Sequence, residues 1–116
     1  PRGTERDQGA ATVVSAGPTG LALLPDGNTL LVTNFNDNSL GVYDLRMGAY
    51  GQLVGEVTFL GENPHTVRVS PDGRYAVVAC YEGDIGDTSV NSTLAVIDVD
   101  ATSDTWLEVI TWIANL

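Results

Sequence analysis

Two residues near the middle of the chain carry side chains suited to chemistry. His65 is the single imidazole among the 116 residues, and Arg68 follows it three positions later. A histidine can act as a general base or ligand near neutral pH, and a guanidinium group binds carboxylate or phosphate in a bidentate manner. The structural alternatives are a loop histidine hydrogen-bonded to backbone and an ion pair between Arg68 and a neighbouring acidic residue. One histidine among many serines does not define a Ser-His-Asp triad.

A second candidate site is the acidic segment 82–92. Glu82, Asp84 and Asp87 stand there among two glycines and several neutral oxygen-bearing side chains. Such a loop could wrap a hard cation such as Ca²⁺, which takes about 6–8 oxygen ligands, although the spacing is not that of an EF-hand. The alternative is a solvated acidic loop. Ca²⁺ is therefore the one possible cofactor that the sequence suggests, and no other is expected.

The composition restricts the classes of partner. The chain has five arginines, no lysine and 15 acidic residues, which gives a net charge of −10. Scattered arginines do not form a stripe that follows phosphates, so we expect no nucleic acid and no anionic membrane surface as partner. The absence of lysine excludes Schiff-base chemistry, and a single cysteine excludes an internal disulfide framework. No apolar run approaches the ~20 residues of a membrane-spanning helix, so no membrane span is expected.

The elements that must position these residues form an internal repeat. Residues 17–27 align with 63–73 at an offset of 46 and share a Pro-Asp-Gly turn. The alignment resumes with 39–45 on 93–99 at an offset of 54, so the second copy has an eight-residue insertion inside 82–92. Each copy predicts four strands, rich in Val, Ile, Leu, Thr and Tyr and bounded by turn residues. The expected strands are 20–24, 29–35, 39–45 and 53–60, then 66–70, 75–81, 93–99 and 106–113.

The second strand of each copy is apolar on both faces, as in Ala76-Val77-Val78-Ala79-Cys80. A strand without a polar face must be covered on both sides. Radially stacked four-stranded sheets of about 40–50 residues provide this cover, which predicts a β-propeller. Asp44 and Asp98 end the third strands at equivalent positions, which favours a turn-capping role.

The repeat also carries a family resemblance. Leu31-Val32-Thr33-Asn34, followed by Asn38-Ser39-Leu40-Gly41-Val42-Tyr43-Asp44, resembles the YVTN-type propeller repeat. The second copy looks like a diverged member, with Val78-Ala79-Cys80 in place of Val-Thr-Asn. The resemblance covers roughly residues 17–113 and implies a propeller of the surface-layer or lactonase-like kind.

Two blades are fewer than the roughly 4–8 that a propeller needs, so we expect an all-β piece of a longer propeller. The alternative is that several copies of the chain assemble into one ring. The expected layout is a tail at 1–9, the outer strand of a preceding blade at 10–16, a blade repeat at 17–61, and a second blade repeat at 62–116 with its insertion at 82–92.

The resemblance implies two alternative functions. The preferred one is a non-enzymatic binding or interaction scaffold at the cell surface or in the periplasm, because YVTN-type repeats resemble those of surface-layer and exported proteins. Its partners would be the remaining blades or other copies of the chain, with a protein or carbohydrate as ligand. The alternative is a fragment of a lactonase-type hydrolase acting on sugar lactones, since segment 64–75 is similar to segments of such propellers. In that case His65 and Arg68 would line the substrate channel.

Overall fold

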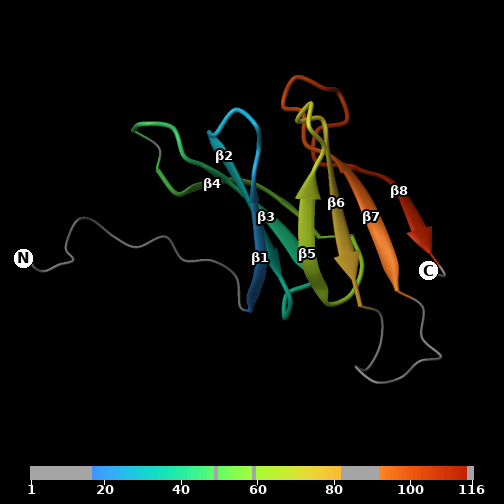
Figure 1. Cartoon of the computed structure of the whole chain (residues 1–116). Coiled ribbons are helices and arrows are strands. Elements are labelled where there is room, and N and C mark those ends of the chain that lie inside the picture. Colours follow the sequence, from blue (N-terminus) through green and yellow to red (C-terminus); the bar gives the residue numbers. More distant parts are fainter. Residues whose placement is uncertain (1–16, 49, 59, 82–91, 115–116) are drawn as a thin grey trace, which may run out of the picture.

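The chain folds into two antiparallel four-stranded sheets, without a helix in the part described (Figure 1). The computed structural model describes residues 17–48, 50–58, 60–81 and 92–114. Each sheet follows chain order, so every strand pairs with the next one along the sequence. The strands are β1 Pro18–Leu23, β2 Thr29–Asn34, β3 Ser39–Asp44 and β4 Gln52–Val57 in the first sheet, and β5 Pro64–Val69, β6 Tyr75–Cys80, β7 Thr93–Asp98 and β8 Val109–Ala114 in the second.

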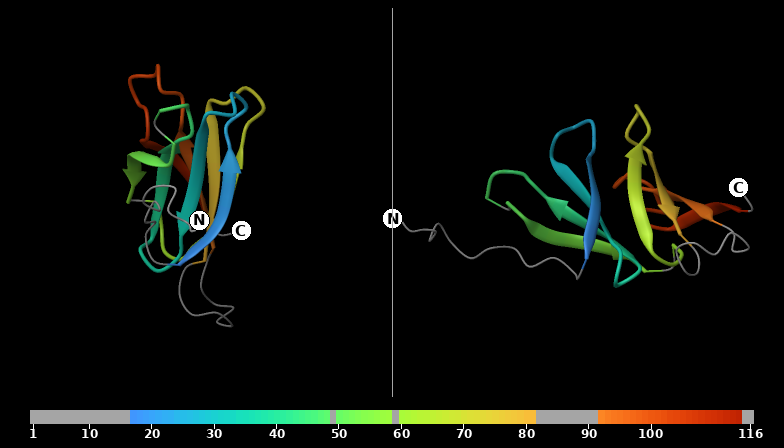
Figure 2. Two further views of the ribbon diagram at one scale, coloured as in Figure 1. Left: turned by 90° about the vertical axis from the view of Figure 1, so that its left-hand side faces the viewer. Right: turned by 60° about the horizontal axis from the view of Figure 1, so that its bottom comes forward.

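The two sheets are arranged as neighbouring blades. Strands β1 and β5 lie side by side, whereas β4 and β8 lie on opposite outer sides (Figures 1 and 2). The core fills the space between the sheets, where Leu31 and Leu40 of the first sheet and Ile97 of the second are fully buried. We call β1–β4 blade 1 and β5–β8 blade 2. This arrangement confirms the all-β fold of two antiparallel propeller blades.

The Pro-Asp-Gly turns have the predicted form in both blades. The amide of Gly27 donates to the carbonyl of Leu24 at 2.9 Å, and Gly73 donates to Ser70 at the same distance. Both glycines have positive φ, 75° and 77°, which a glycine adopts without strain. The turns therefore close β1 onto β2 and β5 onto β6 by one shared device.

The blades also share their irregularities. A register shift between Pro18 and Gly20 leaves Thr19 as a bulge in β1, and the same shift in β5 makes His65 a bulge. Equivalent shifts between β3 and β4 and between β7 and β8 occur near the outer edge of each blade. Because bulges and register recur, positions of blade 1 and blade 2 can be compared one by one.

Several predicted strand boundaries were wrong. The first strand of each blade begins two residues earlier than predicted, and β4 ends at Val57 instead of residue 60. The last strand begins at Val109 instead of residue 106, because Leu107 has a φ of 66° and its amide donates to the carbonyl of Asp98, the last residue of β7. A left-handed backbone conformation cannot continue a strand. The expected strand at 10–16 and most of the insertion at 82–92 lie outside the described residues.

Candidate functional site

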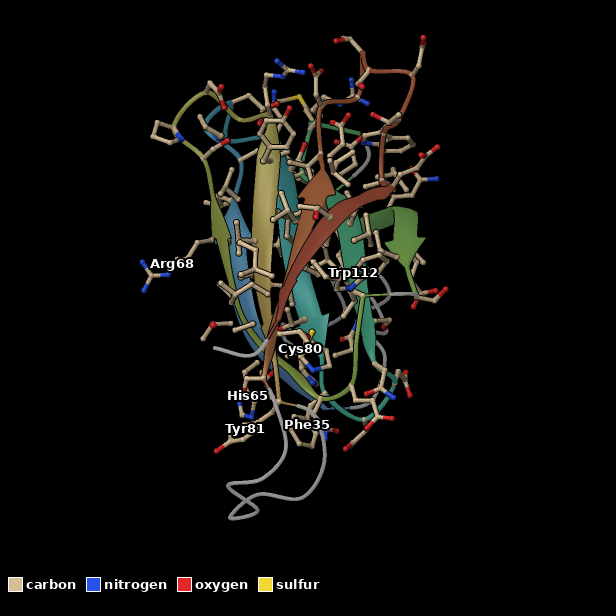
Figure 3. All side chains as sticks on the ribbon, turned by 90° about the vertical axis from the view of Figure 1, so that its right-hand side faces the viewer. Phe35, His65, Arg68, Cys80, Tyr81 and Trp112 are labelled. Atoms are coloured by element: carbon tan, nitrogen blue, oxygen red, sulfur yellow. The ribbon has the colours of Figure 1, made fainter. Side chains whose placement is uncertain are left out.

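The inner strands form the wall that a propeller would present to its central channel. Three side chains at the middle of β1 and β5 are exposed. Leu21 is 71% exposed and Leu23 54%, both on the face of blade 1 turned away from blade 2, and Arg68 of β5 is exposed as well. Figure 3 shows the Arg68 side chain extending away from the sheet. Arg68 lies on β5, the first strand of the second sheet, which is the strand that the sequence predicts as innermost.

Arg68 differs from the other described arginines in its partners. Arg46 forms an ion pair with Asp44 at 2.7 Å, and Arg74 lies 4.0 Å from Asp100. Within the described residues, the side chain of Arg68 has no ion pair or hydrogen bond, although its backbone is paired with Val77 in the sheet. The guanidinium group of Arg68 is therefore available to a ligand, and the ion-pair alternative has no support among these residues. Its role as a site residue stays a prediction.

His65 lies at the opposite end of β5 from the turn that follows Val69, at the bulge. Its ring makes edge contacts with Phe35 of blade 1 and Tyr81 of blade 2, at centroid distances of 5.1 and 5.9 Å. The Nε2 atom is buried and has no hydrogen-bond partner among the residues that the structure describes. The Nε2 atom therefore gives no support to the alternative of a loop histidine hydrogen-bonded to backbone, and the role of His65 stays a prediction.

The structure does not bring His65 and Arg68 together. Three residues of strand span about 10 Å, and Figure 3 shows Arg68 projecting at mid-strand while His65 lies at the lower end beside Tyr81. A base and an anion-binding group at this separation do not contact one small functional group at the same time. The two residues are therefore better treated as two separate features of the surface.

The predicted Ca²⁺ ligands Glu82, Asp84 and Asp87 lie outside the described residues, so that site stays a prediction. Among the residues that the structure describes, no group of three or more His, Cys, Asp or Glu side chains is placed to hold a metal ion.

A groove between the blades lies at the end of the Pro-Asp-Gly turns. It has a volume of about 510 Å³, and Asp26, Asp72, Asp100 and Trp106 are among its lining residues. The hydroxyl of Ser70 and the amide of Arg74 lower the pKa of Asp72. Thr102, through its hydroxyl and amide, lowers the pKa of Asp100. The groove is therefore net negative at neutral pH, although Arg46, paired with Asp44, also lines it.

The sequence predicts a turn role for Asp26 and Asp72 and gives no separate sign of this groove. The signal that could have found it is the recurrence of acidic turns at the same end of two adjacent blades. A negative groove suits a cation or a ligand rich in hydroxyl groups.

The aspartates that end the third strands cap turns, as their repetition predicts. Asp44 accepts the amide of Arg46 at 2.9 Å, and Asp98 accepts the amide of Asp100 at the same distance. The hydrogen bonds from Arg46 hold the pKa of Asp44 below its ordinary value. These carboxylates therefore serve the fold.

Four-stranded antiparallel sheets that share a core and meet at their inner strands define part of a β-propeller. A family model, "Lactonase, 7-bladed beta-propeller", matches residues 4–103, and the chain belongs to this family. The assignment to the YVTN-type repeat itself stays a prediction.

The fold is also seen in a solved structure, the first of the two described next. A functionally unknown protein from Desulfotomaculum acetoxidans DSM 771 is 23% identical with a TM-score of 0.66, over 88% of this chain and 29% of that one. Hydrazine synthase from Kuenenia stuttgartiensis is 18% identical with a TM-score of 0.45, over 84% of this chain and 37% of that one. None of the curated proteins compared with the chain matches it.

The chain therefore spans less than a third of the length of the first of these structures. In the described part of the chain, no helix is long and apolar enough to cross a membrane.

Proposed function

We propose that the chain forms two consecutive blades of a seven-bladed propeller that acts as a non-enzymatic binding scaffold at the cell surface or in the periplasm. Arg68 is its ligand-contacting residue: it lies on the inner strand beside Val77, at the channel edge of the far face of blade 2, and receives a carboxylate or phosphate group of the ligand. The observation that carries this proposal is an exposed arginine on an innermost strand, without an acidic partner among the described residues of a chain with net charge −10.

The uneven burial of equivalent residues supports the placement within a ring. Leu31, Leu40 and Val42 of blade 1 face blade 2 and are at most 2% exposed. Their equivalents on the far face of blade 2 are only partly buried, namely Val77, Leu94 and Val96. An apolar sheet face of this kind needs a cover, and a following blade repeats the cover that blade 2 gives to blade 1.

The repeat also supports a ligand role for Arg68. The equivalent position in blade 1 is Ala22, which pairs with Leu31 and packs against the core between the blades. A guanidinium group is therefore not required by the blade architecture at this position. Arginine forms planar, bidentate contacts with carboxylates and phosphates, which gives the substitution a chemical purpose.

Hydrolysis of a sugar lactone in the same channel is the second candidate. It is favoured by the family match over residues 4–103. In that case Arg68 would bind an acidic or phosphate group of the lactone. The geometry favours the scaffold over the hydrolase, because the single imidazole is packed between Phe35 and Tyr81 instead of standing beside Arg68.

The test is titration of the purified protein with gluconate and with inorganic phosphate, followed by calorimetry or NMR. We expect Arg68→Gln to weaken binding by about tenfold or more, the equivalent of one charge-assisted pair. Arg74→Gln is the matched control, because it removes the same charge at the turn end of blade 2. Equal loss in both variants would contradict a specific role for Arg68.

Catalysis and location are tested separately. Hydrolysis of a sugar lactone above background that is lost in Arg68→Gln would replace the scaffold by the second candidate. Fractionation of the producing cells tests the location, since recovery in the cytosolic fraction alone would contradict a surface or periplasmic scaffold.

A further inference from the structure

The joint between blades 1 and 2 is very close at its lower end. Thr19 donates its hydroxyl to the carbonyl of Pro64 at 3.0 Å, and Thr33 donates to the carbonyl of His65 at 2.9 Å. Gly20 lies between these contacts, and a Cβ at this residue would stand 2.5 Å from the His65 carbonyl oxygen. The bulge of β5 therefore rests directly on the backbone of β1, which only a glycine permits.

The equivalent positions of blade 2 have different side chains. His65 stands in the place of Thr19, Thr66 in the place of Gly20, and Ala79 in the place of Thr33. The Cβ of Thr66 fills the space that the next bulge would need for an equally close approach. Ala79 lacks the hydroxyl with which Thr33 bonds the neighbouring blade. His65 replaces the hydroxyl of Thr19 by a longer side chain with an N–H group.

In the outer half of the joint, too, a glycine of blade 1 is replaced by a larger residue in blade 2. Gly55 of β4 receives the side chain of Leu107, whose Cδ1 atom would overlap a Cβ at this position. The register pairs Gly55 with Val42 and Thr111 with Val96, so Thr111 is the blade 2 equivalent of Gly55. Thr111 carries the Cβ that Gly55 lacks. Thr66 and Thr111 on the far face of blade 2 therefore hold a neighbouring blade farther away than Gly20 and Gly55 hold blade 2 from blade 1.

The surroundings of His65 are incomplete in the two blades alone. Its Nε2 atom is closed off from solvent and has no hydrogen-bond partner among the described residues, a state that costs free energy in a folded protein, and a new partner reaches it when the ring turns. A pocket of about 260 Å³ adjoins the ring and is lined by residues that include Ala79, Tyr81 and Leu94. Tyr81 is the blade 2 equivalent of Phe35, the ring that His65 contacts in blade 1, and it is 41% exposed. Phe35 contacts the ring of His65, and His65 contacts Tyr81, but the other side of Tyr81 is exposed at this pocket.

We infer that the pocket seats the inner strand of the following blade, and that His65 spans this wider joint by donating an imidazole N–H to the first carbonyl of that strand. The accepting group corresponds to the Pro64 carbonyl, which Thr19 bonds in the closer joint. This inference rests on the proposed function, because it takes the occupant to be the following blade of the same propeller. It assigns the single imidazole to the joint between blades and not to the channel.

The test uses two variants of the assembled propeller, one that keeps a hydrogen-bond donor at position 65 and one that keeps an aromatic ring there. His65→Gln keeps an N–H donor without the ring, and His65→Phe keeps the ring without a donor. We expect His65→Phe to lower the thermal midpoint by roughly 2–4 °C and His65→Gln to stay near the unchanged protein. A loss in both variants, or in His65→Gln alone, would show that the ring serves packing and would overturn the inference.

Val77→Asp separates this inference from the proposed function. Val77 lies on the far face of blade 2 and is only partly buried there, so a charge at this position destabilises the protein far more if a blade covers it. An unchanged midpoint in Val77→Asp would contradict the proposed ring itself, and the inference with it. A lowered midpoint, together with full tolerance of His65→Phe, would overturn the role of His65 alone.

Discussion

Asp98 offers the sharpest test of how the blade is held together. This carboxylate is 2% exposed, and its Oδ2 atom accepts the hydroxyls of Ser103 and Thr105, both at 2.5 Å. Its Oδ1 atom accepts the amide of Asp100 at 2.9 Å. Burial raises the pKa of Asp98, but these hydrogen bonds outweigh it and hold the pKa below the ordinary value. The folded state therefore favours the ionised carboxylate.

We expect Asp98→Asn to lower the free energy of unfolding by about 1.5–3 kcal/mol at pH 7. The amide keeps one acceptor oxygen and the two hydroxyls can turn to accept from its NH₂ group, so the loss is that of charge-assisted bonding, not of every contact. Urea denaturation measures the difference. Asp104→Asn, at an exposed position of the same turn, is the matched control and should change the free energy by no more than about 0.5 kcal/mol.

The pH dependence of this difference has a definite sign. A depressed folded-state pKa gives stability that is present above the unfolded value of about 3.9 and is lost as the pH falls through the folded value. The gap between the unchanged protein and Asp98→Asn should therefore be full at pH 7 and shrink between about pH 4 and pH 3. A gap of the same size at pH 7 and at pH 3 would refute the charge-based reasoning.

Two further predictions concern the contacts between blades. Leu40→Ala should cost about 2–5 kcal/mol because Leu40 is fully buried, and in the assembled propeller the equivalent Leu94→Ala should cost a similar amount. Denaturant unfolding measures both, and a cost below about 1 kcal/mol for Leu94→Ala alone would contradict a following blade. Gly20→Ala should cost about 1–3 kcal/mol, since the new Cβ meets the carbonyl of His65. Thr66→Ala is its control, and an equal effect of the two substitutions on the thermal midpoint would contradict the close joint.

The strands could be predicted from the sequence because the repeat supplies the same information twice. Pro-Asp-Gly turns fix where β1 and β5 end, and the doubly apolar runs around Leu31 and Val77 require cover on both faces. The start of β8 could not be predicted, because Trp106 and Leu107 have strand-like side chains. Their backbone is instead set by a turn whose form depends on the buried carboxylate of Asp98.

The candidate site was harder to predict because it depends on distances across the fold. The sequence places His65 and Arg68 three positions apart, but it does not show that a bulge and two aromatic rings hold the histidine away from the arginine. The groove near Asp26 and Asp72 is likewise a product of two loops that meet only when the blades pack.

Positions with the same residue in both blades are required by the blade architecture, whereas positions with different residues are available for a function such as ligand binding. Gly27 and Gly73 are identical and have the same φ within a few degrees, so the turn requires them. Where blade 1 has Ala22 and blade 2 has Arg68, the architecture requires neither side chain. A function carried by these two blades is therefore expected at such unequal positions on the inner strand, which is the physical reason for assigning ligand contact to Arg68.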